Sequence, residues 1–310
     1  MTSATDFSQV TIVGFGLIGS SIARGLKEAD VAGRIVAYDI NQHHLDQAKD
    51  LDLASDYTTN LSVALSEADF IVMATPVGAA NDLLRDVLDH APEGAVIIDV
   101  GSVKEAFANA AQSAATQKHF IVPCHPISGT EQSGPSAGFG NLFRGRWCII
   151  TPLKTDTPEY DAAVERVVQF WQALGSMTEI MEAKHHDIAL AATSHLPHLI
   201  AFTMMGAVDD LESVAESEVI KYSAGGFRDF TRIAASDPVM WRDVFIHNKS
   251  AVLEVLGRFT EELVAMQRAI RWGEADTLES AFRRGREIRR AILDAGQEKD
   301  VPNFGRDDPE

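Results

Sequence analysis

The first half of the chain alternates between short apolar, β-branched runs and longer segments whose apolar residues recur at helical spacing. The short runs are typical of buried strands, and the longer segments are typical of amphipathic helices. The predicted strands are Val10–Val13, Ile35–Tyr38, Phe70–Ala74, Ala95–Val100, Phe120–Cys124, Trp147–Thr151 and a short one near Met177–Met181. The helices predicted between them include Ala79–Leu88, Lys104–Ala115 and one from about Tyr160 to Leu174. This alternation predicts one α/β layer, a doubly wound and mostly parallel sheet covered by helices on both faces.

The second half has a different pattern. From Ala183 to Ala295 the apolar residues recur at helical spacing, with few prolines and almost no strand signal. We therefore expect an α/β domain over residues 1–182, an all-helical domain over 183–296 and a loose polar tail over 297–310. Helices as apolar as Leu190–Val208 need a surface to pack against, which predicts a homodimer through this half. A large monomeric core is the alternative.

One stretch of the helical half, Ile188–Val208, is apolar enough to suggest a membrane-spanning helix. It contains His195, Pro197 and His198, which favour a buried helix of a soluble protein. Met1–Gln9 is polar and lacks the apolar core of a signal peptide. We expect a cytoplasmic protein.

Charge and cysteine content exclude several classes of function. The formal net charge of −18 argues against binding nucleic acid or an anionic membrane, because both would be repelled. An anionic ligand would therefore need local cations in its site. Cys124 and Cys148 have no C-x-x-C spacing, so we expect two buried strand thiols rather than a metal site or a disulfide.

A glycine-rich turn follows the first predicted strand. It consists of Gly14, Phe15, Gly16, Leu17, Ile18 and Gly19. In a G-x-G-x-x-G turn between strand and helix, the first glycine permits a tight turn and the second lets the backbone approach a pyrophosphate. The third lets the helix pack closely on the strand, and the helix N-terminus attracts the phosphates. This pattern predicts a dinucleotide-binding domain.

The ends of the next two strands extend this interpretation. Asp39 follows the second strand, about 20 residues after Gly19, where an acid accepts the ribose hydroxyls and repels a 2′-phosphate. The cofactor is therefore expected to be NAD rather than NADP. An ordinary strand–helix turn with a capping acid is the alternative. Thr75 and Pro76 end the third strand and are expected to leave room for the cofactor. A simple strand stop is the alternative.

His125 is the strongest catalytic candidate at the later strand ends. A histidine takes up a proton near neutral pH, and the following Pro126 keeps it extended at the edge of the sheet. Gly101 and Ser102 follow the neighbouring strand, Gly101 as a cofactor contact and Ser102 as a hydroxyl that orients the imidazole. A structural histidine is the alternative.

The helical half contributes a second set of candidates. His195 and His198 are three positions apart, but with no carboxylate at a matching step we expect no metal. Arg228 and Arg232 are one helical turn apart, after a glycine pair, and guanidinium groups bind carboxylates well. They are candidates for the cations that an anionic ligand needs. A solvated charged helix face is the alternative.

Five motifs occur in an order that resembles the prephenate dehydrogenase family. They are G-F-G-L-I-G, D-V-G-S-V-K, H-P-I-S-G-T-E, S-H-L-P-H and G-G-F-R-D-F-T-R-I-A-A-S-D-P-V-M-W. The likeness runs from about Val10 to Arg271 and covers both predicted domains. It implies a Rossmann-type domain followed by a helical dimerisation domain, similar to the architecture of 6-phosphogluconate dehydrogenases. The implied reaction is the NAD-dependent oxidative decarboxylation of prephenate, or of its amino analogue arogenate, in tyrosine biosynthesis.

The resemblance also implies a role for each candidate residue. His125 would be the catalytic histidine, which accepts the proton of the ring hydroxyl, and Ser102 would bind beside it. His195 and Arg232 would contact the substrate, Arg232 through a carboxylate, with Arg228 as a neighbour. The substrate pocket would be lined by a short segment downstream of His125, which consists of Ser128, Gly129, Thr130 and Glu131. Asp187 would help to shape it.

Two questions stay open at this point. An acid at Glu131 could meet the ammonium group of arogenate, whereas prephenate offers it no partner, so the substrate is not decided. A β-hydroxyacid dehydrogenase or an imine reductase would need a catalytic lysine, but Lys184, Lys221 and Lys249 lie in no matching motif. A non-catalytic NAD sensor is a further alternative.

Overall fold

The computed structural model describes residues 7–114, 118–130, 132–209 and 221–294. Glu131 and the predicted tail 297–310 therefore lie outside the described residues. The chain divides into two compact units, residues 1–253 and residues 254–310. All the other candidate residues belong to the first unit. The domain boundary predicted after residue 182 falls inside this unit and stays a prediction.

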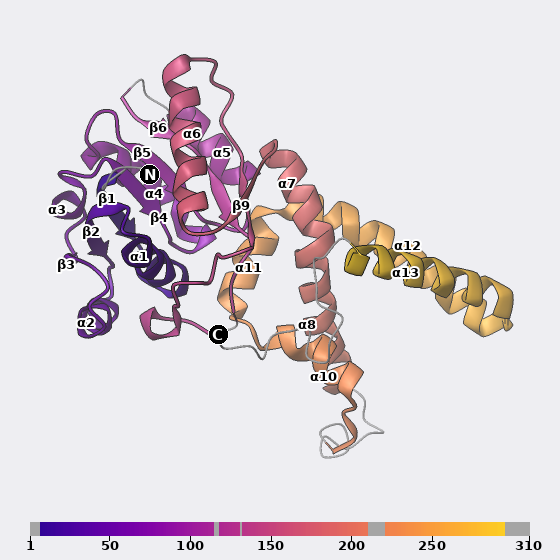
Figure 1. Cartoon of the computed structure of the whole chain (residues 1–310). Coiled ribbons are helices and arrows are strands. Elements are labelled where there is room, and N and C mark those ends of the chain that lie inside the picture. The colour runs from indigo at the N-terminus through magenta and orange to yellow at the C-terminus, as the bar shows by residue number, and fades with distance from the viewer. Residues whose placement is uncertain (1–6, 115–117, 131, 210–220, 295–310) are drawn as a thin grey trace. The chain divides into compact units, whose positions relative to one another are not determined.

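The core of the first unit is a parallel six-stranded sheet (Figure 1). Its spatial order is β3-β2-β1-β4-β5-β6, and every neighbouring pair is parallel. The strands are β1 (Phe7–Val13), β2 (Ala32–Tyr38), β3 (Asp56–Thr58), β4 (Phe70–Met73), β5 (Val96–Asp99) and β6 (Phe120–Ile121). The order reverses direction between β1 and β4, which makes the sheet doubly wound. In such sheets ligands bind beyond the carboxyl ends of the strands at this point.

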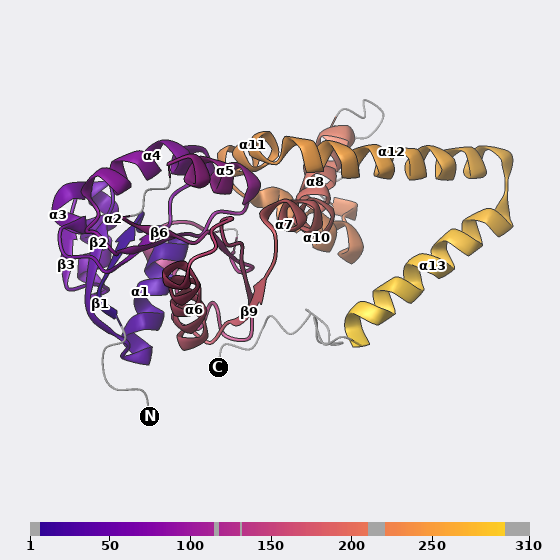
Figure 2. The same ribbon diagram turned by 90° about the horizontal axis from the view of Figure 1, so that it is seen from above.

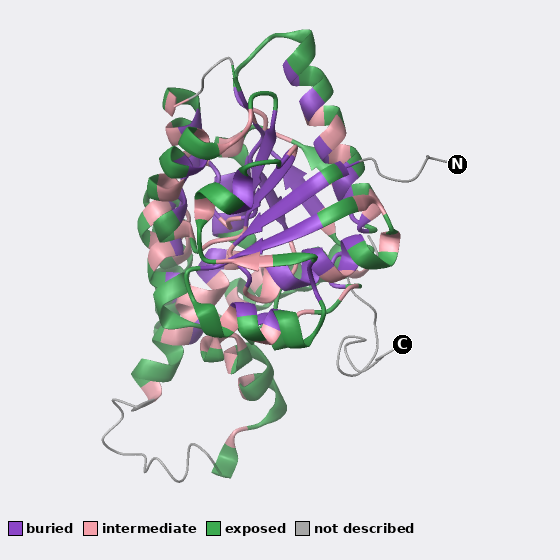
Figure 3. Cartoon of the chain, turned by 90° about the vertical axis from the view of Figure 1, so that its left-hand side faces the viewer, coloured by how far each residue is buried: buried purple, intermediate pink, exposed green. Residues whose placement is uncertain are grey.

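Helices cover both faces of the sheet, as predicted. Figure 2 shows α4 (Val77–His90) and α5 (Glu105–Ala114) on one face, with α1 (Leu17–Ala29) and α6 (Pro158–Ala173) on the other. Two shorter helices, α2 (Gln42–Asp50) and α3 (Leu61–Leu65), and the 3₁₀ turn η1 (Pro135–Ala137) complete this part. The strands are buried along most of their length (Figure 3). Burial on both faces explains why these strands appear in the sequence as continuous apolar runs.

Aromatic packing joins α6 to the sheet. Phe170 of α6 stacks on Phe70 of β4 with ring centroids 4.5 Å apart, and Phe7 of β1 meets both rings edge-on. The helix begins where Thr157 accepts a hydrogen bond from the backbone N–H of Tyr160, with a proline at the first helical position. A polar cap and an early proline are typical of a helix start.

A second sheet corrects part of the sequence prediction. The segment predicted as one strand, Phe120–Cys124, is divided between β6 and β7 (Cys124–Pro126), because Pro123 has no N–H group for the ladder of the first sheet. β7 pairs antiparallel with β8 (Trp147–Ile150), which pairs parallel with β9 (Met177–Ile180). The prediction that these later strands complete the main layer is therefore wrong. Cys124 and Cys148 are buried on neighbouring strands, as expected.

The described residues after Glu182 are helical. They form α7 (Ala183–Leu190), the π-helical turn η2 (Ala191–His195), α8 (Leu196–Asp209), α10 (Gly225–Thr231), the 3₁₀ turn η3 (Arg232–Ala235), α11 (Pro238–His247), α12 (Lys249–Trp272) and α13 (Ala275–Asp294). The continuous helix Ala183–Val208 is long and apolar enough to cross a membrane, by length and composition alone. Only 28% of its apolar window is buried inside the chain, so apolar surface remains for a partner.

The second unit is described from Glu254 to Asp294. It contains the rest of α12 and the whole of α13, joined by a turn in which Gly273 has a φ of +67°. No residue of α13 is buried, and large apolar side chains such as Phe282 and Ile288 are exposed. These helices leave apolar surface uncovered by their own unit.

Candidate active site

The glycine loop after β1 has the geometry expected of a phosphate-binding turn. Gly14 has a φ of +97°, and a Cβ atom there would lie 2.5 Å from the carbonyl oxygen of Ala74. A Cβ atom on Gly19 would collide with the carbonyl group of Gly14, whereas one on Gly16 would meet nothing within 4 Å. Gly14 and Gly19 therefore serve the packing of the chain, and Gly16 borders open space. The helix α1 begins beside it with no side-chain cap, so its first N–H groups suit a pyrophosphate.

Asp39 is fixed against this loop at the end of β2. Its carboxylate accepts hydrogen bonds of 2.8 Å from the backbone N–H groups of Phe15 and Asn41. Nδ1 of His44 lies 3.1 Å from Oδ2 of the same carboxylate. A carboxylate has about four lone-pair positions. It can therefore hold the loop and still accept ribose hydroxyls, so Asp39 and the open space at Gly16 fit a dinucleotide.

A buried ion pair organises the end of β5. Lys104 is fully buried, and its Nζ pairs with Asp99 and donates a hydrogen bond of 2.6 Å to the carbonyl oxygen of Cys124. Burial raises the pKa of Asp99, and the positive charge of Lys104 opposes this effect. The ion pair holds the end of β5 and the start of β7 together, immediately before His125. Lys104 is the last residue of the D-V-G-S-V-K motif, but its burial was not predicted.

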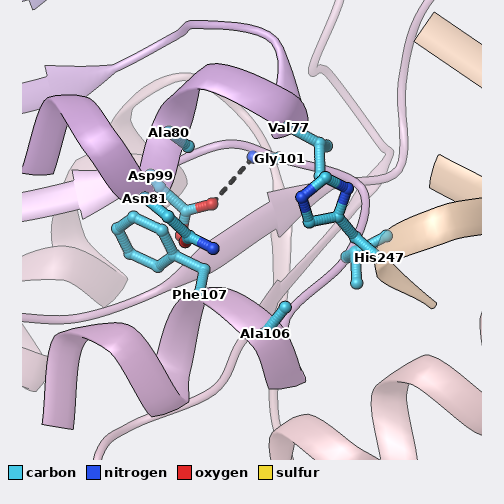
Figure 4. Close-up of a pocket in the computed structure, with 9 residues that line it drawn as sticks. Val77, Ala80, Asn81, Asp99, Gly101, Ala106, Phe107 and His247 are labelled. Atoms are coloured by element: carbon cyan, nitrogen blue, oxygen red, sulfur yellow. Dashed lines mark hydrogen bonds between the residues drawn. The ribbon is translucent and has the colours of Figure 1, made fainter. Parts of the chain in front are cut away.

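Asp99 also accepts the backbone N–H of Gly101 at 3.0 Å, drawn as a dashed line in Figure 4. The figure shows the small cavity beside this bond, into which His247 points from α11. Val77, at the start of α4, lines the same cavity. Gly101 therefore lies just beyond the end of β5 and lines this cavity together with His247. Its contact with the cofactor stays a prediction.

His125 lies on β7 and is buried. Its Nδ1 atom is 2.8 Å from Nε2 of His186 on α7. We predicted Ser102 as the group that orients this imidazole, but Nδ1 is instead paired with His186. Burial, followed by the nearby charges of His186, Lys104 and His195, holds the pKa of His125 well below its usual 6.5. His125 is therefore neutral at neutral pH, as a proton acceptor must be.

Asp187 supports His186 from the other side. The Nδ1 atom of His186 is 2.8 Å from Oδ1 of Asp187. The carboxylate also accepts the backbone N–H groups of Lys104 at 2.8 Å and Glu105 at 2.9 Å, at the start of α5. The side-chain amide of Asn248 donates to the backbone carbonyl of Asp187 at 2.9 Å. Sequence reasoning did not identify His186 or Asn248 as site residues. The one signal available was a pair of adjacent polar residues, His186 and Asp187, inside an apolar helix.

His195 lies at the end of the π-helical turn η2. Such turns often occur at functional sites, because the extra residue changes the direction of a side chain. Nδ1 of His195 is 3.0 Å from the side-chain amide of Asn248, and burial lowers its pKa to about 4. Its Nε2 atom is buried without a hydrogen-bond partner, as are Oγ of Ser128 and Oγ1 of Thr75. Buried polar atoms are normally paired, so these three suit a site that a ligand completes.

The other predicted contacts lie on more exposed segments. Gly129 and Thr130 are exposed after β7, and Pro76 is exposed at the start of α4. Arg232 is the first residue of η3, and its charge contributes, after burial, to the lowered pKa of His198. The charge of Arg232 therefore acts on His198. Arg232 and Arg228, one turn earlier on α10, are both exposed.

Fold and site together define a dinucleotide-dependent dehydrogenase. A doubly wound sheet carries a glycine loop at its switch point and an acid at the end of the next strand, and a neutral histidine lies on β7, which Lys104 ties to the end of β5. Residues 22–180 match the nucleotide-binding domain of prephenate dehydrogenase, and residues 182–284 match its dimerization domain. The chain belongs to the prephenate dehydrogenase family.

Individual relatives agree with this assignment. The chain is 36% identical to the cyclohexadienyl dehydrogenase of Zymomonas mobilis, over 93% of this chain and 97% of that protein. It is 30% identical to the prephenate dehydrogenase of Bacillus subtilis, over 95% and 78%. The structure of Aquifex aeolicus prephenate dehydrogenase in complex with hydroxyphenyl propionate and NAD+ superimposes with a TM-score of 0.87. That chain is 31% identical, and the match covers 94% of this chain and 100% of that one.

Proposed function

We propose that this protein catalyses the NAD-dependent oxidative decarboxylation of prephenate to 4-hydroxyphenylpyruvate, with arogenate as the alternative substrate of the same site. The observation that carries the proposal is the neutral, buried His125 on β7, in a chain whose glycine loop after β1 borders open space. The family match supports the reaction, and the Aquifex aeolicus relative has been solved with NAD+ and a hydroxyphenyl compound.

The cofactor would be held by the loop Gly14–Gly19, with Asp39 at the ribose and with Thr75, Pro76 and Gly101 along the neighbouring strand ends. The chemistry that NAD supplies when bound is the acceptance of a hydride. The repulsion between the carboxylate of Asp39 and a 2′-phosphate favours NAD over NADP.

His125 would act on the ring hydroxyl of the substrate. As hydride leaves the carbon that carries this hydroxyl, Nε2 of His125 takes up the hydroxyl proton. The bond to the ring carboxylate breaks, carbon dioxide leaves, and its electron pair completes the aromatic ring. The proton then returns to the phenolate oxygen, so the reaction releases no proton overall. Aromatisation drives the loss of carbon dioxide, and the protein mainly supplies orientation and a proton acceptor.

Donors in the pocket would bind the oxygen atoms of the substrate. The amide nitrogen of Asn248 donates to a backbone carbonyl and also faces Nδ1 of His195, so Nδ1 accepts and Nε2 carries the proton. His195 therefore offers an unpaired N–H group. Arg232 would bind a carboxylate, with Arg228 beside it, and Ser102, Ser128, Gly129 and Thr130 would line the pocket. Glu131, which lies outside the described residues, would meet the ammonium group of arogenate.

We further propose that the protein is a cytoplasmic homodimer. The family match over residues 182–284 bears the description of a dimerization domain. Exposed apolar side chains on α8, α12 and α13, among them Met204, Leu263 and Phe282, would be covered by a second copy. Light scattering of the purified protein tests this assembly.

The function is tested by following NADH formation when purified protein and NAD are offered prephenate and arogenate in parallel. We expect turnover of at least one of them, and the ratio of the two kcat/KM values identifies the preferred substrate. Binding of NAD without turnover of either would overturn the proposed reaction.

A further inference from the structure

A line of buried hydrogen bonds runs from the start of α5 to His125. The backbone N–H groups of Lys104 and Glu105 donate to Asp187, whose Oδ1 lies 2.8 Å from Nδ1 of His186. Nε2 of His186 lies 2.8 Å from Nδ1 of His125. The side chains of His186 and Asp187 are 0% and 1% exposed, so no bulk water competes for these bonds. In the proposed reaction only His125, at the end of this line, acts on the substrate.

The hydrogen-bonding capacities fix where the protons lie. An ionised carboxylate only accepts, so Nδ1 of His186 must be the donor to Asp187. In a neutral imidazole the other nitrogen is then an acceptor, so Nε2 of His186 accepts from Nδ1 of His125. The second nitrogen of His125, Nε2, is consequently left without a proton. A base that takes the hydroxyl proton needs this tautomer.

We propose that His186 is a positioning residue, backed by Asp187, that holds His125 in the tautomer with Nε2 open and stabilises the imidazolium formed during the reaction. This inference rests on the proposed function. When Nε2 of His125 gains a proton, its Nδ1–H becomes a charged donor to His186, and hydrogen bonds to charged groups are the stronger ones. No proton needs to leave His125 through this line.

The other charged groups around His125 do not replace this support. Lys104, immediately before α5, and His195, on η2, both disfavour a positive charge on His125. A protonated His186 would do the same, but burial lowers the pKa of His186, so its neutral imidazole accepts the hydrogen bond instead. Asp99, at the end of β5, is already paired with Lys104. Among the described residues, the carboxylate linked to His125 is that of Asp187, through His186. The backbone N–H groups of Lys104 and Glu105 hold this carboxylate in place.

The first test compares His186→Phe, which removes the acceptor, with His186→Gln, whose amide oxygen reaches the position of Nε2. A third variant, Asp187→Asn, breaks the link to the carboxylate. His119→Gln is the matched control, because His119 is also buried but bonds the carbonyl oxygen of Ala91. Each variant is checked for folding by its melting temperature and for NAD binding.

We expect His186→Phe to lower kcat by about 10-fold to 100-fold, as for other orienting partners, with NAD binding unchanged. The acidic limb of the pH–rate profile should move down by about one to two pH units, because the imidazolium loses a hydrogen bond to its charged form. His186→Gln should recover part of both effects, and His119→Gln should show neither. A lower kcat with an unmoved acidic limb would overturn the proposal, since a purely structural role predicts that result.

The second test needs no substrate. Nitrogen-15 NMR of the histidine side chains reports which ring nitrogen carries the proton. We expect the proton of neutral His125 on Nδ1 in the unaltered protein and a shift toward Nε2 in His186→Phe and Asp187→Asn. A proton on Nε2 of His125 in the unaltered protein would overturn the proposal. If neither substrate is oxidised, the proposed reaction fails, and this measurement still decides the role of His186.

Discussion

The side chain of Asp187 accepts a hydrogen bond of 2.8 Å from the backbone N–H of Lys104, across 83 positions of sequence. This bond joins α7 to the segment that follows β5. Asn248 adds a second tie, because its amide donates to the backbone carbonyl of Asp187 and faces His195. The candidate histidines of the two halves of the site are therefore held in one polar network, and each of the following predictions tests one part of the site.

The cofactor loop can be tested without disturbing the fold. Gly16 has a φ of −77°, and a Cβ atom there would meet nothing within 4 Å, so Gly16→Ala should leave the melting temperature unchanged. The added methyl would lie where the pyrophosphate must approach, so NAD binding should weaken by about tenfold or more. Calorimetric titration with NAD measures this effect. Gly257→Ala, on an open face of α12, is the control, and unaltered binding by Gly16→Ala would remove the phosphates from this loop.

Asp39 should set the choice between NAD and NADP. Asp39→Asn removes the negative charge that repels a 2′-phosphate, so the kcat/KM ratio of NAD to NADP should fall. Steady-state kinetics with both cofactors measure the ratio, and Asp46→Asn, an exposed acid on α2, should leave it unchanged. Because Asp39 also holds the N–H of Phe15, the melting temperature is measured alongside. An unchanged ratio would mean that Asp39 does not reach the ribose.

His125 should be required for turnover but not for cofactor binding. His125→Asn removes the proton acceptor at Nε2, and kcat should fall by about 10²–10⁴-fold. NAD affinity should remain nearly intact, because the loop at Gly14–Gly19 and Asp39 is unaltered. NADH formation and NAD titration measure the two quantities. His185→Asn changes an exposed histidine of the same helix as His186 and serves as the control, and full activity of His125→Asn would exclude His125 from the chemistry.

The pH dependence follows from the direction of the pKa shift. Burial holds the pKa of His125 well below 6.5, so the neutral, proton-accepting form persists into mildly acidic solution. The value of kcat/KM should therefore stay level as the pH falls through 6.5 and decline only at lower pH, because protonation of His125 abolishes its function. A profile measured from about pH 4 to pH 9 covers this limb. A decline centred at or above 6.5 would contradict the assignment of the limb to a buried His125.

Arg232 should contribute to substrate binding. Removing a guanidinium that pairs with a desolvated carboxylate costs about 2–5 kcal/mol, so Arg232→Ala should raise KM strongly. NAD affinity should not change. Arg228→Ala removes the same type of charge one turn earlier and should have a smaller effect. Initial rates at varied substrate concentration measure both variants, and a normal KM for Arg232→Ala would place this residue outside the substrate site.

Local patterns were sufficient for much of the fold. The parallel sheet, the helices on both its faces and the glycine loop were predicted because buried strands, amphipathic helices and tight turns each depend on neighbouring residues. The second sheet was not predicted. Pro123 interrupts the run Phe120–Cys124, and the pairing of β7 with β8 and β9 depends on contacts between distant segments. A pattern of apolar residues identifies a strand but does not identify its neighbour in space.

In the candidate site, too, local patterns predicted some features and contacts between distant segments decided others. The sequence by itself determined that Asp39 follows a strand, because a position at a strand end depends on nearby residues. His125 was predicted to follow a strand as well, but it lies within β7 of the second sheet. Only the tertiary structure decided that Nδ1 of His125 pairs with His186 rather than with Ser102, and that Lys104 is buried in an ion pair. The contact between His125 and His186 joins residues 61 positions apart and forms only when the helices after Glu182 pack against the first half, so no spacing along the sequence indicates it. Lys104 and Asp99 are close in sequence, but the burial of their pair also depends on Cys124, 20 positions after Lys104.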